Sequence, residues 1–187
     1  MSVSPYMRTL RDYINPDTEI LAVGINPSPI SVQQGYPFAA SRNRFWDALN
    51  ASWFVSSTYT PSIESMVELL AVERIGFTDL VKRPTPGISD LRASDYRLGS
   101  SQLADKIRHY SPLIVWFQGK TAYVKFLHYG LGRRDRTVAW GEQPPLYAGI
   151  DAFVTPNPSS ANAVYSLNDI CSWMNRLAAF AGRSAPK

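Results

Sequence analysis

The chain has 187 residues, a hydrophobic fraction of 45%, a formal net charge of +4 and a single cysteine, Cys171. This length suits one domain with a full core, and a single cysteine excludes an internal disulfide or a cysteine-rich metal cluster within one chain. No apolar run reaches the length of a membrane span, and residues 1–5 carry no signal pattern. We therefore expect one cytoplasmic domain over residues 1–187, with a frayed tail at 183–187.

Apolar runs and helical patterns alternate along the first half of the chain. We expect a helix over 7–13, a strand over 19–24, a long loop over 27–41, and helices over 42–49 and 61–72. Thr60 and Pro61 suit the N-cap and the first turn of the last of these helices. The long loop carries the aromatics Tyr36 and Phe38, which argues for function rather than disorder.

The same alternation continues in the second half of the chain. A run of mixed character covers 76–81 and an exposed basic loop covers 82–87. We then expect a helix over 98–110, a strand over 113–117, a helix over 121–128, a basic turn over 130–136, a strand over 152–155, and a helix over 167–181 capped by Ser166. Strands that alternate with helices predict an α/β fold with a mostly parallel sheet.

Two of the predicted strands end in the same sequence, Asn-Pro-Ser. Asn26 follows the strand at 19–24, and Asn157 follows the strand at 152–155. If these strands lie side by side in one parallel sheet, both amides face a common crevice at the carboxyl edge, where ligands of such sheets bind. Asn-Pro is also a common turn dipeptide, so each motif taken singly is consistent with a plain turn.

The residues near these motifs favour one kind of chemistry. An amide is a weak base, but Asn26 can hold a water molecule by accepting one hydrogen bond and donating another. Cleavage of an N-glycosidic bond needs little nucleophilic push, because the sugar tolerates oxocarbenium character. Backbone N–H groups over 24–28 could stabilise a departing pyrimidine anion, and Phe38 could stack on a flipped base. His109 and His128 lie among surface-type residues, so we expect neither to be a ligand or a base.

Several motifs in combination resemble the mismatch-specific uracil-DNA glycosylase and thymine-DNA glycosylase family, from about residue 20 to residue 176. They are Gly-Ile-Asn-Pro-Ser at 24–28, Gly-Tyr-Pro-Phe at 35–38, Asn-Arg-Phe-Trp at 43–46, Thr-Asp-Leu-Val-Lys-Arg-Pro-Thr at 78–85, Gly-Lys at 119–120, Trp-Gly at 140–141, and Asn-Pro-Ser at 157–159. The resemblance implies a three-layer α/β/α domain around a short, mostly parallel sheet. It also implies removal of uracil and related damaged pyrimidines from DNA, without a cofactor or a metal.

The resemblance also implies roles for individual residues. Asn26 would position the attacking water, while Asp79 is a second catalytic candidate. The expected base-binding residues are Gly24, Ile25, Tyr36, Phe38 and Asn157. The residues expected to contact DNA are Ser159, Ser160, Ala161 and Asn162 of the loop that enters the minor groove, with Lys82, Arg83, Lys120, Arg133 and Arg134 as candidate phosphate contacts. The partner would be double- or single-stranded DNA, bound by a monomer, with no membrane involved.

The sequence departs from the family pattern in three places. The loop at 160–163 offers only small or polar side chains where relatives carry a bulky wedge, which predicts weak product binding or loose reading of the opposite guanine. The Asp and His of the classical uracil glycosylases are replaced by Asn26 and Asn157. Asp79 stands where some relatives carry Lys, and a capping or surface role for it is about as plausible as a catalytic one. The single Cys171 excludes the iron–sulfur branches, which need four cysteine ligands.

Two alternatives stay open at this point. The first is a nucleic-acid-binding module of the same fold with little catalysis, which the missing wedge and the lack of a strong base favour. The second is an N-glycosidase of free nucleosides or nucleotides, with Gly119 and Lys120 holding a phosphate. Replacement of Asn26 by Ala separates a glycosylase from a binding module, because only the glycosylase would lose cleavage while it keeps binding.

Overall fold

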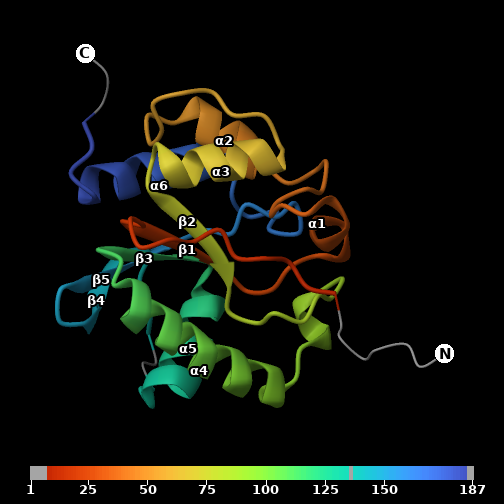
Figure 1. The fold of residues 1–187 in the computed structure, drawn as a ribbon, viewed down its shortest axis with the longest axis vertical. Coiled ribbons are helices and arrows are strands. Elements are labelled where there is room, and N and C mark those ends of the chain that lie inside the picture. The colour runs from red at the N-terminus through yellow and green to blue at the C-terminus, as the bar shows by residue number, and fades with distance from the viewer. Residues whose placement is uncertain (1–7, 135–136, 185–187) are drawn as a thin grey trace.

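A twisted sheet of five strands lies between two layers of helices (Figure 1). The structure, a computed structural model, describes residues 8–134 and 137–184. The strand order is β2-β1-β3-β5-β4, with β4 antiparallel to its neighbour and the other pairs parallel. The elements are β1 (Ile20–Gly24), α1 (Pro29–Gln34), α2 (Phe45–Ala51), α3 (Ile63–Ala71), β2 (Ile75–Asp79), the 3-10 helix η1 (Ile88–Asp90), α4 (Ala93–Tyr110), β3 (Ile114–Gln118), α5 (Lys120–Leu131), β4 (Gly141–Tyr147), β5 (Ile150–Thr155) and α6 (Leu167–Phe180).

The helices confirm the expected three-layer α/β/α arrangement. Helices α2, α3 and α6 cover one face of the sheet, and α4 and α5 cover the other (Figure 1). Because both faces are covered, the parallel strands are apolar on both sides and appear in the sequence as continuous apolar runs. No helix in the described part of the chain combines the length and hydropathy needed to cross a membrane.

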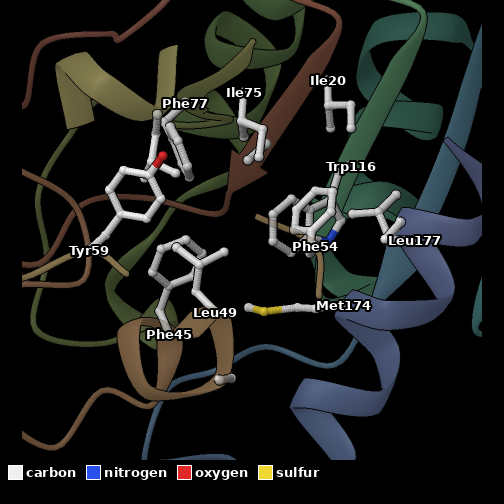
Figure 2. Packing of buried hydrophobic residues seen from close by; sticks show 14 of the residues in the cluster. Ile20, Phe45, Leu49, Phe54, Tyr59, Ile75, Phe77, Trp116, Met174 and Leu177 are labelled. Carbon is white, nitrogen blue, oxygen red and sulfur yellow. The ribbon is translucent and has the colours of Figure 1, made fainter. Parts of the chain in front are cut away.

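The core on the α2 and α6 side is rich in aromatic rings. Figure 2 shows Phe45 of α2 and Met174 of α6 pointing toward the sheet, where Trp116 of β3 is buried. The ring of Phe45 stacks over Trp116 with centroids 6.3 Å apart, and Phe54 meets Trp116 edge-on at 5.6 Å. These contacts fix the start of α2 over the middle of the sheet, next to the carboxyl ends of the central strands.

The predicted helix at 7–13 is wrong over the residues that the structure describes; residue 7 lies outside them. Tyr13 instead forms an antiparallel bridge with Phe77 of β2, with N–H···O distances of 2.9 and 2.7 Å. Leu10 and Tyr13 are three positions apart, which imitates one face of a helix. Both side chains are buried, because this extended segment covers the edge of the sheet.

Two other helix starts differ from prediction because local capping decides them. The expected loop at 27–41 contains α1, which Ser28 caps by accepting from the Ser31 N–H and which Pro29 begins. Helix α3 begins at Ile63 rather than at 61, with Ser62 as its N-cap in place of Thr60.

One strand was not predicted from the sequence, another was predicted only as a run of mixed character, and two helices are longer than predicted. The run at 76–81 proves to belong to strand β2, and β4 was not anticipated because Pro144 and Pro145 interrupt it, which an edge strand tolerates. Helix α4 begins at Ala93, five residues before the predicted start. Helix α5 extends to Leu131, into the turn predicted at 130–136, of which 135–136 lie outside the described residues.

The order of the strands places the ligand edge between β1 and β3. The chain passes from β1 to β2 on one side and then crosses to β3 on the other side of β1, which makes this the switch point of the sheet. The expectation that the two strands preceding Asn26 and Asn157 lie side by side is wrong. These strands are β1 and β5, and β3 lies between them. Asn26 and Asn157 follow strands that end at the same edge but are separated by the width of β3.

Candidate active site

Three residues from neighbouring strands lie at one level of the carboxyl edge. Gly24 of β1 is the register partner of Asp79 of β2, and the register of β1 with β3 brings Gly24 level with Gln118. Side chains alternate between faces along a strand, so Asp79 and Gln118 extend from the face covered by α2 and α6, as Phe77 and Trp116 do two positions earlier. Gly24 therefore leaves a gap between a carboxyl group and a carboxamide.

A small cavity lies on the Asp79 side of this gap. It has a volume of about 10 Å³ and is lined by Gly24, Phe38, Asp79 and their neighbours, which is room for about one water molecule. Phe38 has a φ of 60°, uncommon for an aromatic residue, and its ring stacks on Phe45 with centroids 3.9 Å apart. A planar base is much larger than this cavity, so entry of a base requires a displacement of the loop that carries Phe38.

Asp79 is the titratable group of this cavity. Burial raises the pKa of Asp79 to about 6, while the nearby charges of Lys82, Asp12 and Lys106 act on it in opposing directions. Lys82 and Lys106 both pair with Asp12, at 2.7 and 2.5 Å. No described residue forms a hydrogen bond with the Asp79 carboxylate, so its oxygens remain open to a ligand. A Cβ atom at position 24 would lie 2.6 Å from Asp79 Oδ1, so a larger residue there would displace the carboxylate.

The side chain of Asn26 is held in one orientation. Its Nδ2 atom donates to Thr85 Oγ1 at 2.7 Å, to the Arg83 carbonyl at 3.1 Å, and more weakly to the Pro27 carbonyl at 3.4 Å. Thr85 Oγ1 donates its own hydrogen to the Gly87 carbonyl at 2.7 Å, so it must accept from Asn26. Among the described residues none donates to Asn26 Oδ1, which leaves this oxygen free to accept a hydrogen bond from water.

Asn157 uses its amide differently. Nδ2 donates to the Gln118 carbonyl at 3.2 Å, and Oδ1 accepts from the Ser159 N–H at 2.7 Å. The Asn157 carbonyl also accepts from Asn162 Nδ2 at 3.0 Å. The amide of Asn157 thus ties its own loop to the end of β3, which leaves it less free than Asn26 to contact a base.

Arg44, immediately before α2, also holds the loop that follows Asn157. Its guanidinium group donates to the carbonyl oxygens of Pro158, Ser159, Asn162 and Tyr165, and its backbone N–H donates to Pro158 as well. No carboxylate in the described part of the chain pairs with it. One half-buried cation therefore fixes the course of the loop from 158 to 165.

The comparisons with known proteins agree with this geometry. The sequence matches the uracil DNA glycosylase superfamily over residues 11–180. The chain belongs to the uracil DNA glycosylase superfamily. The solution NMR structure of a proposed uracil DNA glycosylase from Methanosarcina acetivorans is similar in fold, with a TM-score of 0.58 and 20% identity over 89% of this chain and 93% of that chain. Membership of the superfamily supports cleavage of the bond between base and sugar as the reaction, and DNA as the substrate.

The loop after Asn157 carries an exposed apolar side chain in addition to the small and polar residues expected from the sequence. Ser160, Ala161 and Ala163 are exposed and small, as expected. Val164 follows them in the same loop and is 84% exposed, the highest value for a large apolar side chain in the described residues. Val164 therefore gives the loop an apolar side chain one position beyond the small and polar residues at 160–163.

The predicted phosphate contacts differ in how free their charges are. Lys82 pairs with Asp12 at 2.7 Å, and Arg83 forms an ion pair with Asp95 at 2.6 Å. The segment at 82–87 is therefore not the exposed basic loop that we expected, because its two cations are half-buried and paired internally. Lys120 lies over the ring of Trp140 at 4.5 Å, at the start of α5, and has no acidic partner among the described residues.

The other base-binding candidates lie apart from the cavity. The side chain of Ile25 packs against the core on the α4 and α5 side, so only its backbone is available to the edge. Tyr36 meets Trp46 edge-on at 6.3 Å and does not line the cavity. The structure thus brings Gly24, Phe38 and Asp79 together, with Asn26 on the continuation of β1.

Three residues of this region were not recognised as site residues from sequence. Thr85 was placed in an exposed loop, although it is buried and anchors Asn26. Arg44 lies in the Asn-Arg-Phe-Trp motif, but no role was predicted for it from the sequence. Gln118 ends the clearest apolar run, which is the same signal that drew attention to Asn26, a polar amide at the carboxyl end of a buried strand.

Proposed function

We propose that the protein hydrolyses the N-glycosidic bond of uracil in DNA, notably at U:G mismatches, and leaves an abasic site. The observation that carries this proposal is the fixed amide of Asn26, whose nitrogen is held by the 83–85 segment while its oxygen stays free to orient water. Such an amide can position a water molecule, although it is only a weak base. That suits a bond that breaks with oxocarbenium character before the water attacks.

The remaining groups have roles consistent with this reaction. At neutral pH the Asp79 carboxyl is mostly ionised, since its pKa is about 6, and can stabilise positive charge on the sugar or assist the water. Phe38 stacks on the base once its loop has moved. Val164 enters the stack where the base has left, as apolar wedges do in other DNA-binding proteins. The protein acts as a monomer in the cytoplasm, with Lys120 among its phosphate contacts and without a cofactor.

The test is an excision assay on labelled duplexes that contain one U:G, U:A or T:G pair, and on a uracil-containing single strand. Hot alkali reveals the abasic sites. We expect the wild-type protein to cleave U:G in chelator-treated buffer. Asn26→Ala should lower the single-turnover rate by about 10²- to 10⁴-fold while DNA binding is retained.

The control is Gln102→Ala, because Gln102 carries an exposed amide in the middle of α4, on the opposite face of the sheet from α2 and α6. This variant should excise uracil at the wild-type rate. An active Asn26→Ala variant would contradict the water-positioning role. Absence of cleavage of every uracil substrate by folded wild-type protein would overturn the proposed function in favour of a binding module.

A further inference from the structure

Three aromatic residues, Trp140, Tyr165 and Trp173, form a strip across the β4 edge of the sheet. The ring of Trp140, the residue before β4, lies 5.5 Å from that of Tyr165 and 6.5 Å from that of Trp173 on α6, between centroids. Trp140 packs against the core on the α4 and α5 side, whereas Tyr165 and Trp173 pack against the other core. All three residues are half-buried, so this aromatic strip is partly open to solvent.

A cation lies over each end of the aromatic strip. Lys120 Nζ is 4.5 Å from the ring centroid of Trp140, and the guanidinium carbon of Arg176 is 4.5 Å from the ring centroid of Trp173. Neither cation forms an ion pair with a carboxylate within residues 8–134 and 137–184. The ring beneath each cation therefore holds the side chain in place while its charge stays available to an anion.

The aromatic strip lies at the same edge of the sheet as the candidate active site. Strand β4 runs antiparallel to β5, and its first residue, Gly141, pairs with Val154 near the carboxyl end of β5. Tyr165, which Arg44 holds through its carbonyl, directly follows the exposed Val164. Three strand spacings, about 14 Å, separate β1 from β4, which is the length of about four stacked nucleotides. The strip thus continues, beyond the 158–165 loop, the edge that the proposed function assigns to DNA.

We propose that the aromatic strip binds an unpaired nucleotide of single-stranded DNA beside the uracil, with its base stacked on the rings and its phosphates on Lys120 and Arg176. This inference rests on the proposed function, which supplies DNA as the ligand. Partly exposed aromatic rings with cations beside them are what proteins use to bind single strands, because an unpaired base offers its π-face for stacking. The strip therefore favours uracil whose flanking nucleotides are unpaired, as in a single strand or in a bubble that contains the mismatch.

The first test measures the binding of a thymidine oligonucleotide without uracil, both as a single strand and paired with its complement, so it does not depend on excision. Trp140→Leu keeps an apolar side chain and removes the large ring. We expect its Kd for the single strand to rise about 5- to 100-fold, as for loss of one stacked base, and its Kd for the duplex to change less than about twofold. Trp140→Phe keeps an aromatic ring and should recover most of the affinity.

Trp53→Leu is the matched control for loss of a half-buried tryptophan. Trp53 lies in a hollow beside Glu19 and Arg74, the residues that precede β1 and β2, and so at the opposite edge of the sheet. This variant should bind the single strand like the wild type. An equal loss of affinity in Trp53→Leu and Trp140→Leu would overturn the assignment of the base to the aromatic strip.

The second test removes one of the two cations. Arg176 is exposed on α6, so Arg176→Gln should fold with a Tm close to that of the wild type. For the single strand, the slope of log K against log salt should become less steep by about 0.7, because one phosphate contact is lost. An unchanged slope would contradict the phosphate contact of Arg176.

Excision of uracil from a single strand connects the strip to the reaction. Trp140→Leu should raise the protein concentration that gives half of the maximal single-turnover rate and should leave the maximal rate near that of the wild type. Wild-type affinity in folded Trp140→Leu, or an equal loss of single-strand and duplex binding, would overturn the inference and leave the strip as packing between β4 and α6. Failure of the proposed function is distinct, because the wild type would then bind the thymidine strand without excising uracil from any substrate.

Discussion

Two loops of this protein begin with the same Asn-Pro-Ser sequence after a buried parallel strand, and they use the asparagine in different ways. At Asn26 the segment 83–85 holds the amide nitrogen and the oxygen has no donor among the described residues. At Asn157 both ends of the amide are bonded within the protein. The difference shows that an identical local sequence leaves an amide oxygen unpaired in one place and uses both ends of the amide as an anchor in the other, depending on which partners the neighbouring segments supply.

The contrast extends to the supports of each loop. Asn26 is held by the Thr85 hydroxyl and by the carbonyls of Arg83 and Pro27, and its Oδ1 atom has no donor among the described residues. The loop after Asn157 is held by its own asparagine and by the guanidinium group of Arg44, whose acceptors span residues 158–165. The first loop thus leaves one side-chain oxygen unpaired, and the second loop has its backbone fixed in one path.

The strongest test of this contrast compares Asn157→Ala with Asn26→Ala. Asn157→Ala should cost about 1–3 kcal/mol of unfolding free energy, because the Ser159 N–H and the Gln118 carbonyl lose their partner, and should change the excision rate by less than about tenfold. Asn26→Ala should lose a similar amount of stability, because Thr85 Oγ1 and the Arg83 carbonyl lose their donor, but its rate should fall by about 10²- to 10⁴-fold. Urea unfolding and single-turnover kinetics measure the two quantities. Similar profiles for the two variants would contradict the division of roles.

The second prediction concerns Arg44. Arg44→Ala should cost about 3 kcal/mol of unfolding free energy, since several carbonyls lose a charged donor, and should weaken binding to a duplex with an abasic site. Arg44→Lys should recover little of this, because an ammonium group cannot span acceptors that a planar guanidinium reaches. Arg42, exposed two residues earlier, gives the control for stability, and Arg42→Ala should unfold like the wild type. A fully stable Arg44→Ala variant would show that Asn157 alone fixes the loop.

The sequence was sufficient for much of the fold and for part of the site. The lengths of the apolar runs predicted β1, β3 and β5, because these strands are almost fully buried. The helical spacing of apolar residues predicted α6, because this helix is strongly amphipathic. These patterns failed for β4, whose prolines are tolerated only at an edge, and for residues 8–13, where Leu10 and Tyr13 imitate a helix but cover the sheet edge. Strand order is a tertiary property, so the separation of Asn26 from Asn157 by β3 could not be predicted from either motif.

The same limit applies to individual side chains of the site. Asn26 was recognised because a polar amide follows a buried strand, and Phe38 because the long loop carries aromatic residues; the resemblance to a known family then implied their roles. Lys82 and Arg83 were expected to face DNA, but a sequence does not show that Asp12 and Asp95 come within 2.7 Å of them. The sequence also does not show that Thr85 accepts a hydrogen bond from Asn26, or that the buried amide of Gln118 has no hydrogen-bond partner among the described residues.

The third prediction concerns how stability depends on pH through the ionisation of Asp79, which lies beside Gly24. Because the folded pKa of Asp79 is about 6, above the usual carboxyl value, its carboxyl ionises in the unfolded chain at a lower pH than in the folded protein, so wild-type stability should fall as pH rises from about 4 to about 6. Asp79→Asn removes this loss, so the variant should gain about 2 kcal/mol relative to the wild type between pH 4 and pH 7. Asp12, Lys82 and Lys106 face the same region and are unchanged in the variant. Parallel curves of Tm against pH for the two proteins would show that folding does not raise the pKa of Asp79.

The smallest expected effect tests how tightly the Asn26 amide must be held. Thr85→Val removes the hydroxyl that accepts from Asn26 Nδ2 at 2.7 Å and keeps the shape of the buried side chain. The Arg83 carbonyl still accepts from the amide, so we expect a fall of only about tenfold in the single-turnover rate, equivalent to one hydrogen bond of about 1.4 kcal/mol. Thr85→Ser keeps the hydroxyl and should remain close to wild type, although it removes a buried methyl group. If Thr85→Val and Thr85→Ser lose activity equally, packing rather than the hydrogen bond governs Asn26. If Thr85→Val instead matches Asn26→Ala, then the orientation of the amide accounts for its whole contribution to catalysis, and the difference between the two asparagine loops reduces to this one hydroxyl.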